Sequence, residues 1–129
     1  MTWLLIDTHT ASRVRAAWLQ VDAKPKELVF EGRAALLLPK LARTWSTHAK
    51  ELAGIVVVAG PGSFTSVRTG VLQANLLARF LKVPLYSASI EETEDLHDLT
   101  ARLQAGELMA SGYVAPIYDA EPNITMPKP

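Results

Sequence analysis

The sequence predicts an α/β protein built on one mixed sheet, with the element order β-β-β-α-β-α-β-α. Two observations support this prediction. Over the first 32 residues, apolar side chains form short runs or alternate with polar ones, which is typical of strands. After residue 37, segments with helical periodicity alternate with short apolar runs. A meander of strands followed by such alternation gives a mixed sheet covered by helices.

Three strands joined by short turns are expected first. Residues 3–7 form an apolar run that ends in the carboxylate of Asp7. Residues 14–21 have a two-residue period, and residues 27–32 predict a third strand after a turn that contains a proline. These strands should form an antiparallel meander, with Asp7 at the end of its first strand.

The next segment changes to helical periodicity. A helix is expected over residues 38–52, with Leu41 and Trp45 on one face and Gly54 ending it. Residues 55–59 are a β-branched run without polar residues. Such a run is typical of a central strand that is buried on both faces.

The alternation continues to residue 106. A glycine-containing turn leads to a second helix over residues 65–81, for which Ser63 or Thr65 is the expected N-cap. Residues 84–88 predict a strand, and residues 91–105 predict a third helix. This helix should end at the glycine that follows it.

Length and composition favour a single soluble domain. The chain has 129 residues, of which 49% are apolar and 20% charged. It has no cysteine, which excludes disulfides, thiolate metal sites and cysteine nucleophiles. The start has no basic segment typical of a signal peptide, and no apolar run approaches the ~20 residues that span a bilayer. We therefore expect a cytoplasmic protein without a membrane partner. Its expected organisation is a lobe over residues 1–112, then a closing strand and extended tail over residues 113–129.

The charges are unevenly distributed although their sum is zero. Residues 1–82 contain eleven Lys and Arg against five Asp and Glu, and residues 83–129 contain two against eight. One explanation is that the two halves attract each other or lie on different faces of one domain. The alternative is a basic face that helps to hold an anionic partner such as RNA. The first is favoured, because no arginine-rich run supports the second.

A nine-residue motif is the most specific feature of the chain. It follows the apolar strand and opens the second helix, and it reads Gly60-Pro61-Gly62-Ser63-Phe64-Thr65-Ser66-Val67-Arg68. Together with Ile6-Asp7-Thr8, it closely resembles the TsaB (YeaZ) family. Shorter matches lie at residues 37–39, 83–85, 103–106 and 115–118.

The resemblance implies an actin-like (ASKHA, ribonuclease H-like) lobe and a role in making threonylcarbamoyladenosine in tRNA. Members of this family usually have a second actin-like lobe. This sequence instead passes from the first lobe to the closing segment near residue 90. Since actin-like enzymes hold nucleotide between two lobes, nucleotide binding by this chain alone is not expected.

Asp7 and Thr8 have two interpretations. Actin-like enzymes place their first phosphate loop here, so the pair could be a vestigial phosphate loop. Alternatively, Asp7 caps a turn by accepting backbone N–H bonds, and this interpretation is favoured. The turn at residues 60–64 lacks the Lys-Ser/Thr ending of a P-loop, so a structural role is favoured there too.

No catalytic residue, metal site or cofactor is expected. His9, His48 and His97 are not spaced four residues apart, so the metal-binding histidine pair of the catalytic relatives is absent. The serines have no nearby base in sequence and no Gly-x-Ser-x-Gly elbow.

The second helix carries the expected partner interface. Small residues at four-residue spacing, including Gly70 and Ala74, predict a groove along one side, into which either the chain's own sheet or a helix of another molecule packs. Leu72, Leu76 and Phe80 lie away from that groove and predict an exposed apolar patch. The full predicted interface is Leu41, Trp45, Arg68, Gly70, Val71, Leu72, Ala74, Leu76, Leu77 and Phe80.

The leading hypothesis is a non-catalytic scaffold or regulatory subunit of the tRNA modification complex. In the resembled family these helices form a bundle with the catalytic relative TsaD or with a second copy. This implies a TsaD-like partner, a TsaE-like ATPase as a further partner, a homodimer through the same helices, and only indirect contact with tRNA. The alternative is an ATP-binding enzyme or peptidase of the actin-like superfamily.

Overall fold

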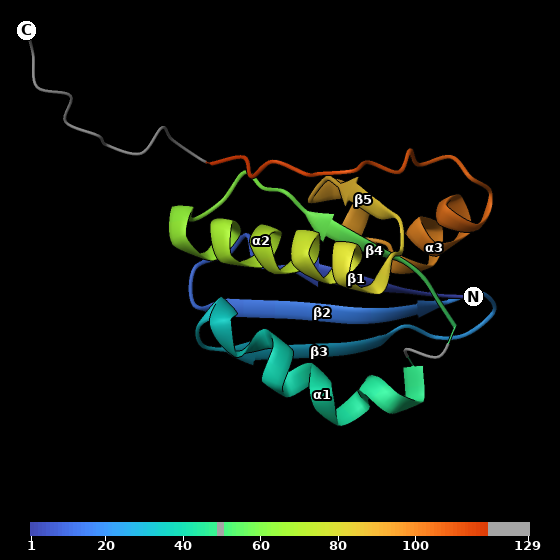
Figure 1. Ribbon diagram of the computed structural model, residues 1–129, viewed down its shortest axis with the longest axis horizontal. Coiled ribbons are helices and arrows are strands. Elements are labelled where there is room, and N and C mark those ends of the chain that lie inside the picture. The colour runs from blue at the N-terminus through green and yellow to red at the C-terminus, as the bar shows by residue number, and fades with distance from the viewer. Residues whose placement is uncertain (49–50, 119–129) are drawn as a thin grey trace, which may run out of the picture.

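Five strands form one mixed sheet with helices on both faces, as the computed structural model shows (Figure 1). The structure describes residues 1–48 and 51–118. The strands are β1 (Thr2–Asp7), β2 (Arg13–Gln20), β3 (Lys26–Glu31), β4 (Leu52–Val58) and β5 (Leu85–Ala88). Their order across the sheet is β3-β2-β1-β4-β5.

The first three strands form the expected meander. β2 pairs antiparallel with both β1 and β3, and the register places Asp7 opposite Arg15. β4 then pairs parallel with β1, and β5 pairs parallel with β4. β1 therefore lies at the centre of the sheet, and all six of its residues are buried.

The helices divide between the two faces of the sheet. The 3-10 helix η1 (Ala34–Leu36), α1 (Leu37–His48) and α2 (Phe64–Leu81) cover one face. The 3-10 helix η3 (Glu91–Thr93) precedes α3 (Leu96–Gln104), which covers the other face. No helix within the described ranges is long and apolar enough to cross a membrane.

Each face of the sheet has its own apolar core. Alternate side chains of a strand point to opposite faces, so Leu4 and Ile6 join the core under α1 and α2, while Trp3 and Leu5 join the core under α3. The predicted order of strands and helices is confirmed by the observed order.

Three predicted boundaries were wrong. The first helix is described over Leu37–His48, and its predicted end at residue 52 lies in β4, as does Gly54. A Cβ atom at Gly54 would lie 2.8 Å from the Tyr86 ring, so this glycine permits close packing and does not end a helix. The predicted helix over residues 91–105 is divided into η3 and α3, because the Asp95 side chain caps α3 by accepting the N–H of Asp98.

The predicted closing strand is wrong for the part of it that the structure describes. Within the described residues 113–118 there is no regular strand, and a single parallel bridge joins Tyr118 to Gly62. The remainder of the predicted closing segment, residues 119–129, lies outside the described residues. Ser63 is the N-cap of α2, as one of the two predicted residues, although its side chain makes no capping hydrogen bond.

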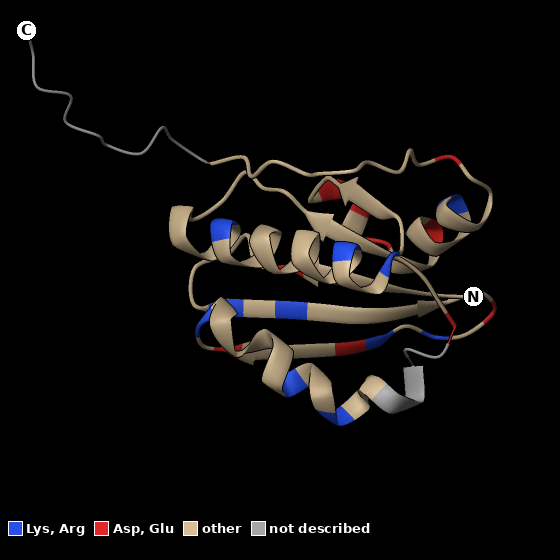
Figure 2. Cartoon of the chain, in the orientation of Figure 1, with Lys and Arg blue, Asp and Glu red and all other residues tan. Residues whose placement is uncertain are grey.

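The uneven charge distribution follows the two faces of the sheet. α1 and α2 contain Lys and Arg but no Asp or Glu, whereas η3 and α3 are predominantly acidic (Figure 2). The two halves of the sequence that differ in charge thus supply helices to different faces. The structure therefore favours the explanation that the two halves lie on different faces of one domain. The face covered by α1 and α2 is basic.

Candidate functional site

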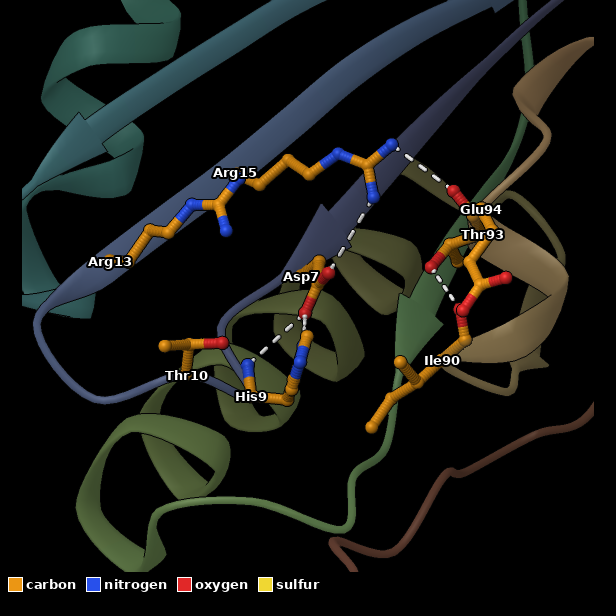
Figure 3. A pocket seen from close by; sticks show the side chains of 8 residues that line it. All are labelled: Asp7, His9, Thr10, Arg13, Arg15, Ile90, Thr93 and Glu94. Carbon is orange, nitrogen blue, oxygen red and sulfur yellow. Dashed lines mark hydrogen bonds and ion pairs between the residues drawn. The ribbon is translucent and has the colours of Figure 1, made fainter.

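The end of β1 borders a small pocket on the side of η3 (Figure 3). The pocket has a volume of about 100 Å³. It is lined by Asp7, His9, Thr10, Arg13, Arg15, Ile90, Thr93 and Glu94. Acidic and basic side chains reach the pocket from β1, β2 and the η3 region, so the pocket is polar and of mixed charge.

Asp7 is 4% exposed, and both of its carboxylate oxygens have partners. Oδ1 accepts the backbone N–H of His9 at 3.1 Å and lies 2.5 Å from His9 Nδ1. Oδ2 lies 3.8 Å from a guanidinium nitrogen of Arg15. Accepting the N–H two residues ahead is the turn-capping role expected for a carboxylate at a strand end.

Arg15 connects this carboxylate to neighbouring elements. Its Nε donates to Glu27 at 2.9 Å, and its Nη2 donates to the carbonyl of Thr93 at 3.1 Å. The guanidinium therefore ties β2 to both β3 and η3. Among the described residues, no group of three or more His, Cys, Asp or Glu could hold a metal ion.

Thr8 joins the end of β1 to α2. Its hydroxyl donates to the carbonyl of Ser66 at 2.7 Å, and its side chain is buried. A Cβ atom at Gly70 would lie 2.0 Å from Thr8 Oγ1, so the glycine makes room for this threonine. Thr8 thus has a structural role here, and its hydroxyl is already used as a donor.

The Gly60–Thr65 motif lies where three segments meet. A Cβ atom at Gly62 would lie 2.2 Å from the carbonyl oxygen of His9, and one at Gly60 would lie 2.0 Å from that of Ile117. Gly60 also has φ +117°, which side chains rarely adopt. The N–H of Ser63 donates to His9, and the N–H of Ile117 donates to Ala59.

The rest of the motif continues this arrangement. The Gly60–Pro61 peptide bond is cis. The ring centroids of Phe64 and Tyr118 lie 4.5 Å apart, and the backbone carbonyl of Thr65 accepts the Thr69 hydroxyl within α2. The motif therefore joins the loop after β1 to the segment over residues 113–118. Close contacts with the backbone explain the glycines at positions 60 and 62, so phosphate binding is not needed to explain them.

Part of the predicted partner interface is corrected, because it faces the chain's own sheet. Leu41, Gly70, Val71 and Ala74 are buried in the core, and Ala74 is 0% exposed. A partner cannot contact these side chains in this structure. The small residues of α2 let the helix approach β1 and β4.

Two more residues of that predicted interface are half-buried. Trp45 packs edge-on against Trp18, with ring centroids 5.7 Å apart. Leu77 also packs against the core. These two side chains mainly hold α1 and α2 on the sheet.

The remaining apolar residues of the predicted interface are exposed. Leu72, Leu76 and Phe80 are 55%, 59% and 83% exposed. Their spacing of four residues places them in a row on α2, on the side opposite the sheet. We call this row the apolar ridge. Arg68 is exposed beside it.

A groove runs along one side of the ridge. Its volume is about 330 Å³, and it separates α2 from the segment over residues 113–118. Asn75 holds the two together, since it donates to the carbonyl of Val114 at 2.9 Å and accepts the Val114 N–H at 3.0 Å. The lining residues are Arg68, Val71, Leu72, Asn75, Tyr113, Pro116 and Tyr118.

Sequence reasoning missed Asn75 and this groove. Asparagine is unfavourable within a helix, because its side chain competes for backbone hydrogen bonds. Its position inside α2 was therefore a usable signal that its side chain has a partner elsewhere. The sequence pattern could not identify that partner as Val114, because it lies 39 residues away in the chain.

On the other side of α2, the junction of η1 and α1 adds to the exposed apolar surface. Leu36 and Leu38 are exposed there. Gln73 of α2 donates to the carbonyl of Ala34 at 3.2 Å, so the junction lies beside α2. The ridge, the groove and this junction form one candidate partner-binding surface.

The sheet order β3-β2-β1-β4-β5, with an antiparallel meander and helices on both faces, defines a ribonuclease H-like lobe of the actin-like type. Residues 32–121 match the family model described as TsaD: tRNA N6-adenosine threonylcarbamoyltransferase. This match covers more than half of the chain, and the chain belongs to that family.

Individual relatives agree with the resemblance to TsaB (YeaZ). The chain is 39% identical over 126 residues to the tRNA threonylcarbamoyladenosine biosynthesis protein TsaB of Bacillus subtilis (strain 168). That match covers 93% of this chain and 51% of the relative, so the chain spans about half the length of the curated protein. The resemblance is thereby confirmed.

Solved structures give the same result. YeaZ from Pseudomonas aeruginosa matches with a TM-score of 0.60 and 26% identity, over 69% of this chain and 45% of that chain. A second structure, described as an uncharacterized protein with similarity to peptidase YEAZ from Pseudomonas aeruginosa, has the same TM-score and identity. It covers 68% of this chain and 43% of its own.

Proposed function

We propose that this chain is a non-catalytic scaffold or regulatory subunit in the threonylcarbamoyladenosine modification of tRNA. It would act in the cytoplasm by docking α2 and the neighbouring start of α1 onto a TsaD-like enzyme. ATP, metal and the transfer chemistry would belong to its partners, among them a TsaE-like ATPase. tRNA would be contacted only indirectly.

The observation that carries this proposal is the apolar ridge. Single exposed apolar residues are ordinary, but a contiguous row on one helix is typical of an interaction site. Fully burying a Leu or Phe side chain gains roughly 1.5–3 kcal/mol. Since more than half of each ridge side chain is exposed, covering all three would gain about 3–6 kcal/mol.

That gain is comparable with the cost of association, which is roughly 4–15 kcal/mol before any contact is counted. The ridge can therefore be the centre of an interface but not the whole of it. The groove beside Asn75 and the exposed Leu36 and Leu38 extend the surface on both sides. Stable interfaces have such an arrangement, with an apolar centre and a more polar rim.

The non-catalytic part of the proposal is supported by the residues at the end of β1. Asp7 is engaged by His9 and Arg15, and the Thr8 hydroxyl donates to Ser66. A phosphate loop would need these groups to be available to a ligand. Calorimetry with ATP and Mg²⁺ separates the alternatives, because measurable binding by the isolated chain would favour an ATP-binding enzyme.

The direct test is co-elution with the TsaD-like protein of the same organism. The native chain should form a complex at micromolar concentration. The double variant Leu76→Asp with Phe80→Asp should lose it, because charges would replace the apolar centre of the ridge. Ala74 is not a suitable probe, since it is buried and a charge there would unfold the chain.

Val29→Asp is the matched control. Val29 is exposed on β3, and its side chain lies on the opposite face of the sheet from Leu28 and Phe30, which pack toward α1. The Val29→Asp variant also replaces an exposed apolar side chain with a charged one, but away from α2, and should leave the complex intact. Loss of the complex in both variants, or in neither, would count against the ridge as the docking site.

A further inference from the structure

A further cavity lies at the opposite end of β1 from Asp7. It is bordered by the end of β2, the β2–β3 turn and α3, on the face of the sheet that α3 covers. Gln20 lines it and pairs with Thr2 at the start of β1, whereas Asp7 is the last residue of that strand. The cavity is therefore separate from the pocket beside His9 and from the apolar ridge.

The size of this cavity suits a small organic molecule. Its volume is about 240 Å³. One water molecule takes up about 30 Å³ of the liquid, and pockets for drug-sized ligands measure roughly 300–1,000 Å³. An occupant of intermediate size, such as one ring with a short substituent, matches this volume.

Small apolar side chains leave the space open. Ala101 and Ala105 line the cavity from the end of α3, and Val21 and Ala23 line it from the turn. Val21 is 38% exposed, so an occupant would cover apolar surface that the chain itself leaves uncovered. Binding sites for small molecules are typically of this kind, with a mostly apolar lining and a few polar groups.

The polar groups of the lining favour a ligand that donates hydrogen bonds. Of the described residues that line the cavity, Asp22 is the one carboxylate, and none is Lys or Arg. Within the described part of the chain, the Asp22 side chain has no ion pair. Gln20 already donates its amide N–H to Thr2 at 3.3 Å, which leaves its amide oxygen as an acceptor. His97 and Gln104 can each donate or accept, so the unmet need is for a cationic donor.

We propose that this cavity binds a small molecule that combines one apolar ring with an ammonium group. The ring would cover Val21 and the alanines of α3, and the ammonium group would pair with Asp22. Charge-assisted hydrogen bonds are roughly twice as strong as neutral ones, so the charge should decide between ligands of similar shape. Because α2 and α3 lie on opposite faces of the sheet, this site does not depend on docking through the ridge.

Three probes of similar shape test this directly. They are benzylamine, which is a cation at neutral pH, benzyl alcohol, which is neutral, and benzoate, which is an anion. Each is titrated into the chain labelled with nitrogen-15, and the amide chemical shifts are followed by NMR. Benzylamine should shift the amides of residues 21–23 and 100–105, with a dissociation constant of roughly 1–10 mM for its about eight non-hydrogen atoms. It should bind about tenfold more tightly than benzyl alcohol, with an advantage that decreases as salt is raised, and benzoate should not bind there.

Two variants test the residues of the cavity separately. Ala101→Leu should abolish binding of benzylamine, because the larger side chain would fill the space for the ring. Asp22→Asn should remove the preference for benzylamine over benzyl alcohol, because it replaces the carboxylate with a neutral amide. Asparagine suits this position, since Asp22 has φ +60° and Asn also tolerates the left-handed conformation.

Each variant has a matched control outside the cavity. Ala42→Leu makes the same change at an exposed position of α1. Asp98→Asn removes an exposed carboxylate of α3 that does not line the cavity. Both should keep the affinity for benzylamine within about twofold, because an exposed charge outside the site is screened by solvent and salt. Urea unfolding of each variant establishes that it is folded.

Three results would overturn the inference. The first is the absence of shifts at these amides at concentrations about tenfold above the expected dissociation constant. The second is binding of benzyl alcohol or benzoate as tight as that of benzylamine, which would show that Asp22 does not select the ligand. The third is unchanged binding by Ala101→Leu, or an equal loss in Ala42→Leu, which would place benzylamine outside the cavity.

Discussion

Substitution of Gly70 by alanine tests the packing that places the ridge. A Cβ atom at Gly70 would lie 2.0 Å from Oγ1, 2.8 Å from Cγ2 and 2.9 Å from Cβ of Thr8. Rotating the Thr8 side chain would move the first two atoms but not the third. The helix and the end of β1 would therefore have to separate slightly.

The expected magnitude follows from three contributions. Alanine is favoured over glycine within a helix by about 1 kcal/mol. Overpacking a core typically costs about 1–3 kcal/mol, and breaking the Thr8–Ser66 hydrogen bond costs about 1 kcal/mol more, because a buried hydroxyl then lacks its partner. We expect a net loss of about 1–3 kcal/mol in the free energy of unfolding.

Urea denaturation followed by circular dichroism measures this loss. A double-mutant cycle with Thr8→Ala identifies its origin, since the smaller side chain removes the two closest contacts. The pair should show a favourable coupling of about 1 kcal/mol. Gly112→Ala is the control, because nothing lies within 4 Å of a Cβ atom there.

The reasoning would be refuted if Gly70→Ala unfolded at the same or a higher urea concentration than the native chain. It would also be refuted if Thr8→Ala failed to relieve the loss. In either case the contact with Thr8 would not be the reason for a glycine at this position.

Two further predictions concern Glu92 and Asn75. The backbone N–H of Ser89 and the guanidinium of Arg102 hold the pKa of Glu92 below its ordinary value of 4.5. The folded state thus favours the ionised form, and this stabilisation is present above that ordinary pKa and lost as pH falls through the lower folded pKa. Urea denaturation should therefore show Glu92→Gln less stable than the native chain at pH 7, with the difference disappearing in acid; a constant difference would contradict this. Asn75→Ala should lose about 1 kcal/mol, because two hydrogen bonds to Val114 outweigh the gain in helix propensity. Hydrogen exchange at the Val114 amide should accelerate, and unchanged protection would rule out this role for Asn75.

The sequence by itself determined the order of strands and helices and the grouping of Leu72, Leu76 and Phe80 on one side of α2. These are local properties, since the period of the side-chain pattern distinguishes a strand from a helix within one segment. Leu72, Leu76 and Phe80 could be assigned to the side of α2 opposite the small residues for the same reason. The nine-residue motif likewise indicated the family from the sequence alone, because its residues are contiguous in the chain.

Only the tertiary structure decided which side of α2 meets the sheet. A row of small residues looks the same in sequence whether it packs against the chain's own strands or against a partner. Gly70 belongs to the first case because Thr8, 62 residues earlier, fills the space beside it. The groove held by Asn75 likewise depends on a segment 39 residues away. Contacts between such distant residues arise from the packing of whole elements, which no local period encodes.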